Sequence, residues 1–160
     1  VGSEMCIRDS MTSYAPLLAK EKHTQWSPDL IYFNNREVKP TTGYYVQKLY
    51  GQNAGSHYIP SQIILDNQDN RVKLRIGSSI VRDSKTGDVI VKLVNLLPVS
   101  VETEIQLPGI GSVQPSAVRT VLAGAPESTP LPVTDTIEVG ANFKQQLPAY
   151  SFTVIRLKTK

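Results

Sequence analysis

Beyond residue 60, apolar and polar residues alternate one by one through much of the chain. Residues 99–107 are the clearest case, with mostly apolar side chains at odd positions and polar ones at even positions, the period of a strand with one buried face. Residues 83–88, which include Gly87, predict a hairpin loop between strands at 79–82 and 89–95. Further strands are predicted at 72–76, 117–122, 136–139, 142–146 and 151–158. Roughly seven or eight short strands with frequent turns favour an antiparallel β-sandwich, consistent with a jelly roll.

The alternating parity also predicts which side chains form the core of this sandwich. The predicted core residues are Val72, Leu74, Ile76, Val91, Leu93, Val101, Ile105, Val121 and Val154. In the last predicted strand, Phe152 and Val154 occupy one parity while Ile155 and Leu157 occupy the other. That pattern predicts a bulge or burial on both faces of this strand.

Residues 11–51 follow a different pattern. Residues 12–19 are almost continuously apolar, as in a parallel strand covered on both faces. A polar stretch containing Trp26 follows, and then a short extended run at 30–33. After Lys39-Pro40, Thr41 or Thr42 can cap a helix that is expected to stop at Gly51. Residues 52–61 predict a linker, which leaves 62–160 as the sandwich domain.

The first ten residues, VGSEMCIRDS, need separate treatment. They resemble a translated sequencing adapter, because the codons GAG ATG TGT ATA AGA GAC AGN encode residues 4–10. Such segments are excluded before fold reasoning. The natural sequence is then expected to begin near Met11, inside a longer parent protein. The only cysteine, Cys6, falls in this stretch, so disulfides and thiol catalysis are not expected in the remainder.

Charge and composition exclude several function classes. Without the first ten residues the chain has 16 basic and 12 acidic residues, and the bases are scattered, which argues against a nucleic-acid partner. His23 and His57 have no second ligand at metal-binding spacing, so neither a metal nor another cofactor is expected. No apolar run approaches the roughly 18 residues of a membrane span, so no membrane partner is expected, and localisation stays unknown.

The order of strand, Trp-containing polar loop and short helix in MTSYAPLLAKEKHTQWSPDLIYFNNREVKPTTGYYVQKLY is distinctive. It resembles the end of the (β/α)8 barrel of the α-L-arabinofuranosidases of glycoside hydrolase family 51, and the remainder, closing with LPAYSFTVIRLK, resembles their C-terminal β-sandwich. The resemblance implies a mainly β chain, with a barrel remnant at 11–51 before the sandwich. It also implies a retaining, exo-acting parent enzyme that acts on arabinan or arabinoxylan, and it suggests a homo-oligomer.

The same resemblance places the loop of residues 20–29 beside the arabinose pocket. It implies that Trp26 stacks on a sugar face while Gln25 and Asp29 bond to hydroxyls. The alternatives are a core or barrel-rim aromatic for Trp26, and solvent exposure or a turn bond for the other two. The tyrosines at 44, 45 and 50 have helical spacing, which favours packing over a sugar platform.

Retaining glycosidases need two carboxyl groups about 5 to 5.5 Å apart. Glu21 is the only carboxylate near the loop, and no second one is identifiable at suitable spacing. In the resembled family both catalytic glutamates precede the point where Met11 begins, so the chain is expected to lack catalytic residues and to be inactive alone. The alternatives are a carbohydrate-binding or a purely structural β-sandwich module. The structural alternative leaves residues 12–50 unexplained.

Overall fold

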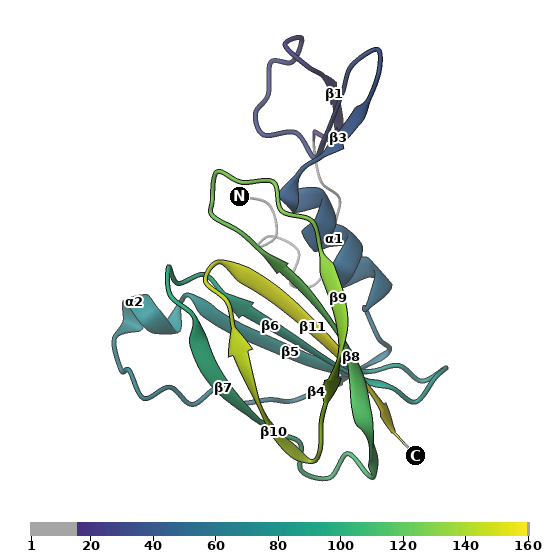
Figure 1. Cartoon of the computed structure of the whole chain (residues 1–160), viewed down its shortest axis with the longest axis vertical. Coiled ribbons are helices and arrows are strands. Elements are labelled where there is room, and N and C mark those ends of the chain that lie inside the picture. Colours follow the sequence, from purple (N-terminus) through teal and green to yellow (C-terminus); the bar gives the residue numbers. More distant parts are fainter. Residues whose placement is uncertain (1–15, 160) are drawn as a thin grey trace. The chain divides into compact units, whose positions relative to one another are not determined.

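The computed structural model describes residues 16–159, and the chain divides into two compact units, residues 1–47 and 48–160. Strands predominate over helices (Figure 1), which confirms the predicted mainly β fold class. The stretch interpreted as an adapter and the first part of the strand predicted at 12–19 lie outside the described residues.

The first unit contains a three-stranded sheet in the order β1 (Leu18–Lys20), β2 (Ile31–Phe33), β3 (Val38–Pro40). β1 pairs with β2 in parallel, and β2 pairs with β3 antiparallel. The extended run predicted at 30–33 is therefore a second parallel strand. Leu17 and Leu18 are 57% and 58% exposed, whereas Ala19 is buried. Within β1 only the central residue is buried, so the predicted burial on both faces is wrong.

Helix α1 (Thr42–Gln52) begins where the sequence predicts. Pro40 ends β3, and the amide of Tyr45 donates to the carbonyl of Thr41 to start the helical ladder. Gly51 lies inside the last turn instead of ending it. The helix ends where the side-chain amide of Asn53 donates to the carbonyl of Leu49 at 2.8 Å. The Asn53 side chain therefore caps the end of the helix, a role that the sequence predicts for Gly51.

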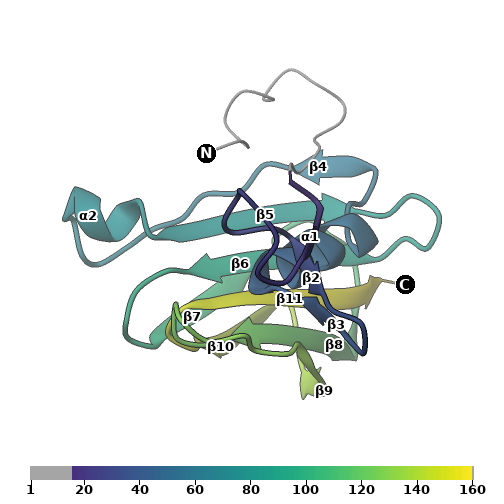
Figure 2. The ribbon, with the colours of Figure 1, turned by 90° about the horizontal axis from the view of Figure 1, so that it is seen from above.

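The second unit is an antiparallel sandwich of a six-stranded and a two-stranded sheet. The six-stranded sheet has the order β4-β5-β6-β11-β8-β9, and the smaller sheet pairs β10 with β7. The strands are β4 (His57–Ile59), β5 (Ile76–Arg82), β6 (Val89–Asn95), β7 (Val101–Gln106), β8 (Val113–Ala123), β9 (Val133–Glu138), β10 (Asn142–Leu147) and β11 (Ser151–Thr159). β11, coloured yellow, runs between β6 and β8 (Figure 2). Residues 52–61, predicted as a linker, contain β4, which pairs with β5.

One apolar cluster joins the two sheets. Ile105 and Leu147 of the smaller sheet pack with Val91, Leu93 and Ile155 of the larger one. Residues 151–155 of β11 are all buried, which confirms the predicted burial on both faces. One face of β11 packs on the smaller sheet through Ile155, and on the other face Phe152 stacks on the ring of Tyr50.

Val154 is buried as predicted, but it does not belong to this cluster. It neighbours Lys92 across the ladder, on the opposite face of the sheet from Val91 and Ile155.

Of the nine predicted core residues, Val91, Leu93, Ile105 and Val154 are buried, whereas Ile76, Val101 and Val121 are only partly buried and outside the core cluster. The remaining two predictions are wrong, because neither residue lies in a strand. Val72 lies in the short helix α2 (Asn70–Lys73) and is only partly buried, and Leu74 is 85% exposed. The Asp69 side chain accepts a hydrogen bond from the amide of Arg71 and so caps a helical turn. Alternation over five residues is too short to outweigh this local bond, and strand β5 starts only at Ile76.

Asn95 is a fully buried polar residue at the end of β6. Its side-chain amide donates to the carbonyls of Val99 and Pro148 at 2.9 and 2.8 Å, and its carbonyl oxygen accepts from the amide of Leu97. One side chain therefore ties together two connections that are far apart in the sequence.

Gly55 is required before β4, because a Cβ at this position would lie 2.5 Å from a methyl group of Val81.

Candidate functional site

Residues 21–30 form an irregular loop that leaves the carboxyl end of β1 and returns to the amino end of β2. The loop starts with a tight turn, in which the amide of His23 donates to the carbonyl of Lys20. Its far end is fixed by the pairing of Leu30 and Ile31 amides with the carbonyls of Pro16 and Leu17. The ends of the loop are therefore held by the sheet. The residues between them include Gln25, Trp26 and Asp29, the three that the sequence predicts as a site.

Thr24 organises the middle of this loop. Its hydroxyl oxygen accepts from the amide of Trp26 at 3.1 Å. Its single proton can reach the Trp26 carbonyl at 3.0 Å or the Asp29 carboxylate at 3.1 Å, and the charged acceptor is the stronger one. The amide of Asp29 in turn donates to the Tyr32 hydroxyl at 2.9 Å. These hydrogen bonds fix the backbone conformation of the loop segment that carries Trp26.

The three predicted site residues differ sharply in exposure. The Trp26 side chain is 68% exposed and Gln25 is exposed as well, so both can meet a ligand. Asp29 is only 1% exposed, and its Oδ1 atom has no hydrogen-bond partner among the described residues. Burial favours the turn-bond alternative for Asp29 over direct contact with a sugar.

A charged cluster lies at the carboxyl end of β1 and β2, and sequence reasoning found only one of its members. The ammonium group of Lys39 lies 2.8 Å from Glu21 and 3.0 Å from Glu37. The side-chain amide of Asn34 donates to Glu21 at 2.8 Å. Glu37 escaped the sequence analysis because it approaches Glu21 only through the antiparallel return of β3.

The Lys39 hydrogen bond, with help from Asn34, lowers the pKa of both the Glu21 and the Glu37 carboxyl. A general acid needs a raised pKa so that it still carries its proton near neutral pH. Both carboxyls are therefore ionised partners of a lysine, and their chemistry does not suit an acid/base pair.

The tyrosines pack, as their spacing predicts. The rings of Tyr44 and Tyr45 meet edge to face with centroids 5.3 Å apart. The ring of Tyr50 stacks on Phe152 at 4.6 Å, with an interplanar angle of 10°. These ring contacts agree with the packing role that the helical spacing predicts.

The sandwich carries an apolar groove of about 280 Å³ beside β7. It is lined chiefly by Ile59, Ile63, Ile80, Leu93 and Ile105 and contains no aromatic residue. Sugar rings are usually held against aromatic faces together with hydrogen-bonding groups. A second hollow, of about 460 Å³, lies in the first unit, where Phe33 and Asn34 meet Leu18 and Val38.

Two further features of the described residues bear on function. Residues 16–159 contain no group of three or more His, Cys, Asp or Glu side chains placed to hold a metal ion. No helix within the same range combines the length and the hydrophobicity needed to cross a bilayer.

Comparison with known proteins gives a consistent family. Residues 5–151 match the model of the α-L-arabinofuranosidase C-terminal domain. The probable α-L-arabinofuranosidase A of Aspergillus terreus is 30% identical over 156 residues, which is 91% of this chain and 23% of that protein. The extracellular exo-α-L-arabinofuranosidase of Streptomyces chartreusis is 50% identical over 52 residues, which is 32% of this chain and 6% of that protein.

Solved structures agree with the sequence matches. An arabinose-bound family 51 α-L-arabinofuranosidase superposes with a TM-score of 0.80 at 32% identity, over 92% of this chain and 24% of that one. The arabinose complex of the Thermotoga maritima α-L-arabinofuranosidase gives a TM-score of 0.66 at 13% identity, over 80% of this chain and 31% of that one, and shows the fold alone. The chain spans less than a third of the length of each of these relatives.

Proposed function

The chain belongs to the family of α-L-arabinofuranosidase C-terminal domains, and from this premise we propose that it is the C-terminal part of a retaining, exo-acting α-L-arabinofuranosidase. The parent enzyme releases terminal arabinose from arabinan or arabinoxylan. The 30% identity to an Aspergillus terreus α-L-arabinofuranosidase over almost the whole chain carries the proposal. The glycosidase names of the relatives support the same class of substrate.

Within that enzyme, residues 11–51 form the end of the catalytic barrel and residues 62–160 the accessory sandwich, joined through 52–61. The order of β1, an irregular loop and then helix α1 supports this division, because each strand of a (β/α)8 barrel is followed by a loop and a helix. The catalytic glutamates belong to the part of the parent that precedes Met11. The ion-paired state of Glu21 and Glu37 supports this assignment, since neither carboxyl is suited to acid/base catalysis.

The loop of residues 21–30 forms part of the rim of the arabinose site. Trp26 offers its exposed indole to a sugar face, and Gln25 offers amide hydrogen bonds. Asp29 has an indirect role: it accepts a hydrogen bond from the Thr24 hydroxyl, and that hydroxyl accepts one from the Trp26 amide. Asp29 therefore helps to hold the backbone of Trp26 in place. The buried carboxylate of Asp29 thus supports the site without itself reaching the ligand.

A stand-alone carbohydrate-binding sandwich is the second candidate, and the described residues favour it less. Its aromatic candidates in the sandwich are Tyr58, Phe143, Tyr150 and Phe152. Tyr58 is 65% exposed, but Phe152 is buried and carries Tyr50 on its ring. One exposed tyrosine outside an aromatic-free groove is a poor platform for a polysaccharide.

Expression of the upstream reading frame together with this chain tests the proposal. The longer protein should hydrolyse an aryl α-L-arabinofuranoside, and the 160-residue chain should show only background turnover. Trp26→Ala should raise KM by about threefold to tenfold through loss of stacking. Tyr58→Ala, which removes an equally exposed aromatic from the sandwich, should leave KM unchanged. An upstream frame without a barrel bearing two glutamates at strand ends would refute the parent enzyme.

A further inference from the structure

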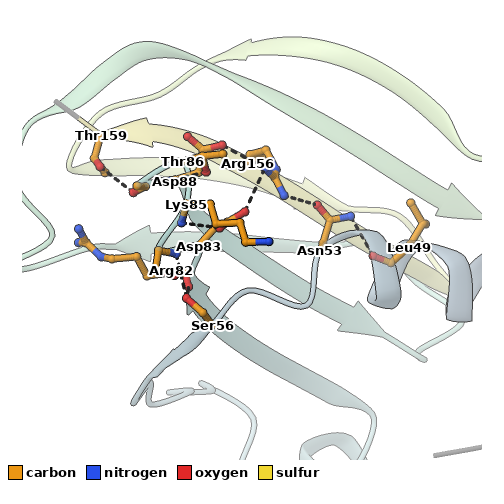
Figure 3. A network of polar contacts seen from close by, with 12 residues as sticks. Leu49, Asn53, Ser56, Arg82, Asp83, Lys85, Thr86, Asp88, Arg156 and Thr159 are labelled. Carbon is orange, nitrogen blue, oxygen red and sulfur yellow. Dashed lines mark hydrogen bonds and ion pairs between the residues drawn. The ribbon is translucent and has the colours of Figure 1, made fainter. Parts of the chain in front are cut away.

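A partly buried charge cluster lies where helix α1 enters the sandwich (Figure 3). The guanidinium group of Arg156, on the last strand, lies 3.1 Å from the carboxylate of Asp88 and 3.9 Å from that of Asp83. The Asp88 side chain is 11% exposed, that of Asp83 24% and that of Arg156 30%. The two carboxylates stand at opposite ends of the β5–β6 hairpin loop, and Arg156 is the cation between them.

The cluster extends to the end of α1. A second nitrogen of Arg156 donates to the side-chain oxygen of Asn53 at 3.4 Å. The amide nitrogen of the same Asn53 side chain donates to the carbonyl of Leu49 at 2.8 Å, one of the last carbonyls of the helix. Figure 3 shows this relay from Arg156 through Asn53 to Leu49.

Other contacts act on the same turn of the helix. Leu49 is 7% exposed, and the ring of Tyr50 stacks on Phe152 of the last strand. The last turn of the helix therefore packs on the sandwich through Leu49 and Tyr50. In addition, Asn53 binds the Leu49 carbonyl on one side and Arg156 on the other. An apolar contact allows sliding and rotation, whereas a directed hydrogen bond from a planar guanidinium does not.

Charge balance makes Arg156 difficult to replace. Without its cation, two carboxylates would face each other in a site from which water is partly excluded, which is unfavourable. An arginine stays charged at all ordinary pH values and can serve Asp88 and Asn53 at once through different nitrogens. A lysine carries the charge but lacks the planar fork.

We propose that Arg156 is a positioning residue that locks the last turn of α1 to the sandwich. The locked element consists of residues 48–53. This inference concerns the chain itself and does not depend on the proposed activity. It assigns the cluster a local role in anchoring the helix, distinct from a general contribution to the stability of the sandwich.

Hydrogen exchange on the 160-residue chain with Arg156→Gln tests this role. Backbone amides of residues 49–53 should exchange about tenfold faster or more, the effect expected from losing a charge-assisted hydrogen bond. Amides of β6 at Val91 and Leu93 should keep their protection. Arg119→Gln is the matched control, since Arg119 is also a strand arginine paired with an aspartate, and its polar partners Asp135 and Gln145 lie on β9 and β10.

Two further variants keep the test decisive if Arg156→Gln fails to fold. Asn53→Ala removes the relay without unbalancing the charges, and it should reproduce the fast exchange of residues 49–53. Arg156→Lys should leave this exchange close to that of Arg156→Gln, because the fork is lost while the charge remains. Unchanged exchange of residues 49–53 in Asn53→Ala, or equal acceleration throughout the chain in Arg156→Gln, would overturn the proposal.

Discussion

Lys92 is the residue whose surroundings are most unusual for its chemistry. It lies in β6 with only 4% of its surface exposed, and its ammonium group lies 5.4 Å from the centroid of the Tyr50 ring. Residues 16–159 offer it no carboxylate partner at salt-bridge distance. Burial lowers the pKa of this ammonium group below its ordinary value of 10.5. The ring recovers part of the lost hydration through a cation–π contact.

Lys92→Met should therefore stabilise the chain at neutral pH. Methionine fills a similar volume without the desolvation cost, and the gain should be about 1 kcal/mol after loss of the cation–π contact. A gain of that size corresponds to about 2–4 °C in Tm. Between the lowered folded pKa and 10.5 the unfolded chain binds a proton that the folded chain does not, so the stability of the original protein rises with pH in this window.

The advantage of Lys92→Met should consequently shrink as the pH approaches 10.5. Thermal melts at neutral and at alkaline pH measure both effects. Lys144→Met is the control, because Lys144 is exposed and paired with Glu102. A lower Tm for Lys92→Met at neutral pH would mean that the ammonium group is better compensated than its contacts indicate.

At the scale of elements, β11 is the central support of the sandwich. It pairs with β6 on one side and β8 on the other, and Ile155 is fully buried. Its neighbours across the ladders are Val91 and Arg119. Loss of the Ile155 side chain leaves a cavity that the two flanking strands cannot close.

Ile155→Ala should lower the free energy of unfolding by about 2–5 kcal/mol, the usual cost of a large buried aliphatic truncation. Val118→Ala, on the adjacent strand and 46% exposed, should cost far less. Urea titration followed by circular dichroism compares the two. A similar cost for both variants would contradict the view that the core is concentrated at β11.

Local sequence pattern predicts the strands of the sandwich better than it predicts the short segments around residue 70. The hairpin of β5 and β6 and the strands β7 to β11 appear where alternation and turn residues place them. Leu74 was assigned to the core on alternation alone, yet the Asp69 cap converts this stretch into a helical turn. Long alternating runs are reliable because many residues agree, and a run of three apolar positions is not.

For the whole molecule, the division into two units has a measurable consequence. Leu17, Leu18 and Val38 in the first unit are more than half exposed, whereas the sandwich has a contiguous apolar core. Hydrogen exchange should therefore be fast across residues 16–35 and slow in β6 and β11. Equal protection throughout would mean that the chain is one complete domain, which would contradict the origin of the first unit as part of a barrel.

The candidate site was only partly accessible to sequence reasoning. The position of Trp26 in a polar loop left open a sugar platform and a core or barrel-rim aromatic, and the structure exposes the side chain. The burial of Asp29 and the approach of Glu37 to Lys39 were not predictable. Both depend on how β2 and β3 return past the loop, which no local pattern records.

The sequence by itself determined the position of most strands, the start of α1 and the family of the chain, because these depend on side-chain period, turn residues and motif order along the chain. Tertiary structure alone decided which polar groups meet. Arg156 and Asp88 are 68 residues apart and come together because β11 lies beside β6 in the sheet. Lys92 is buried because the Tyr50 ring at the end of α1 lies over its ammonium group, a contact that no local pattern records.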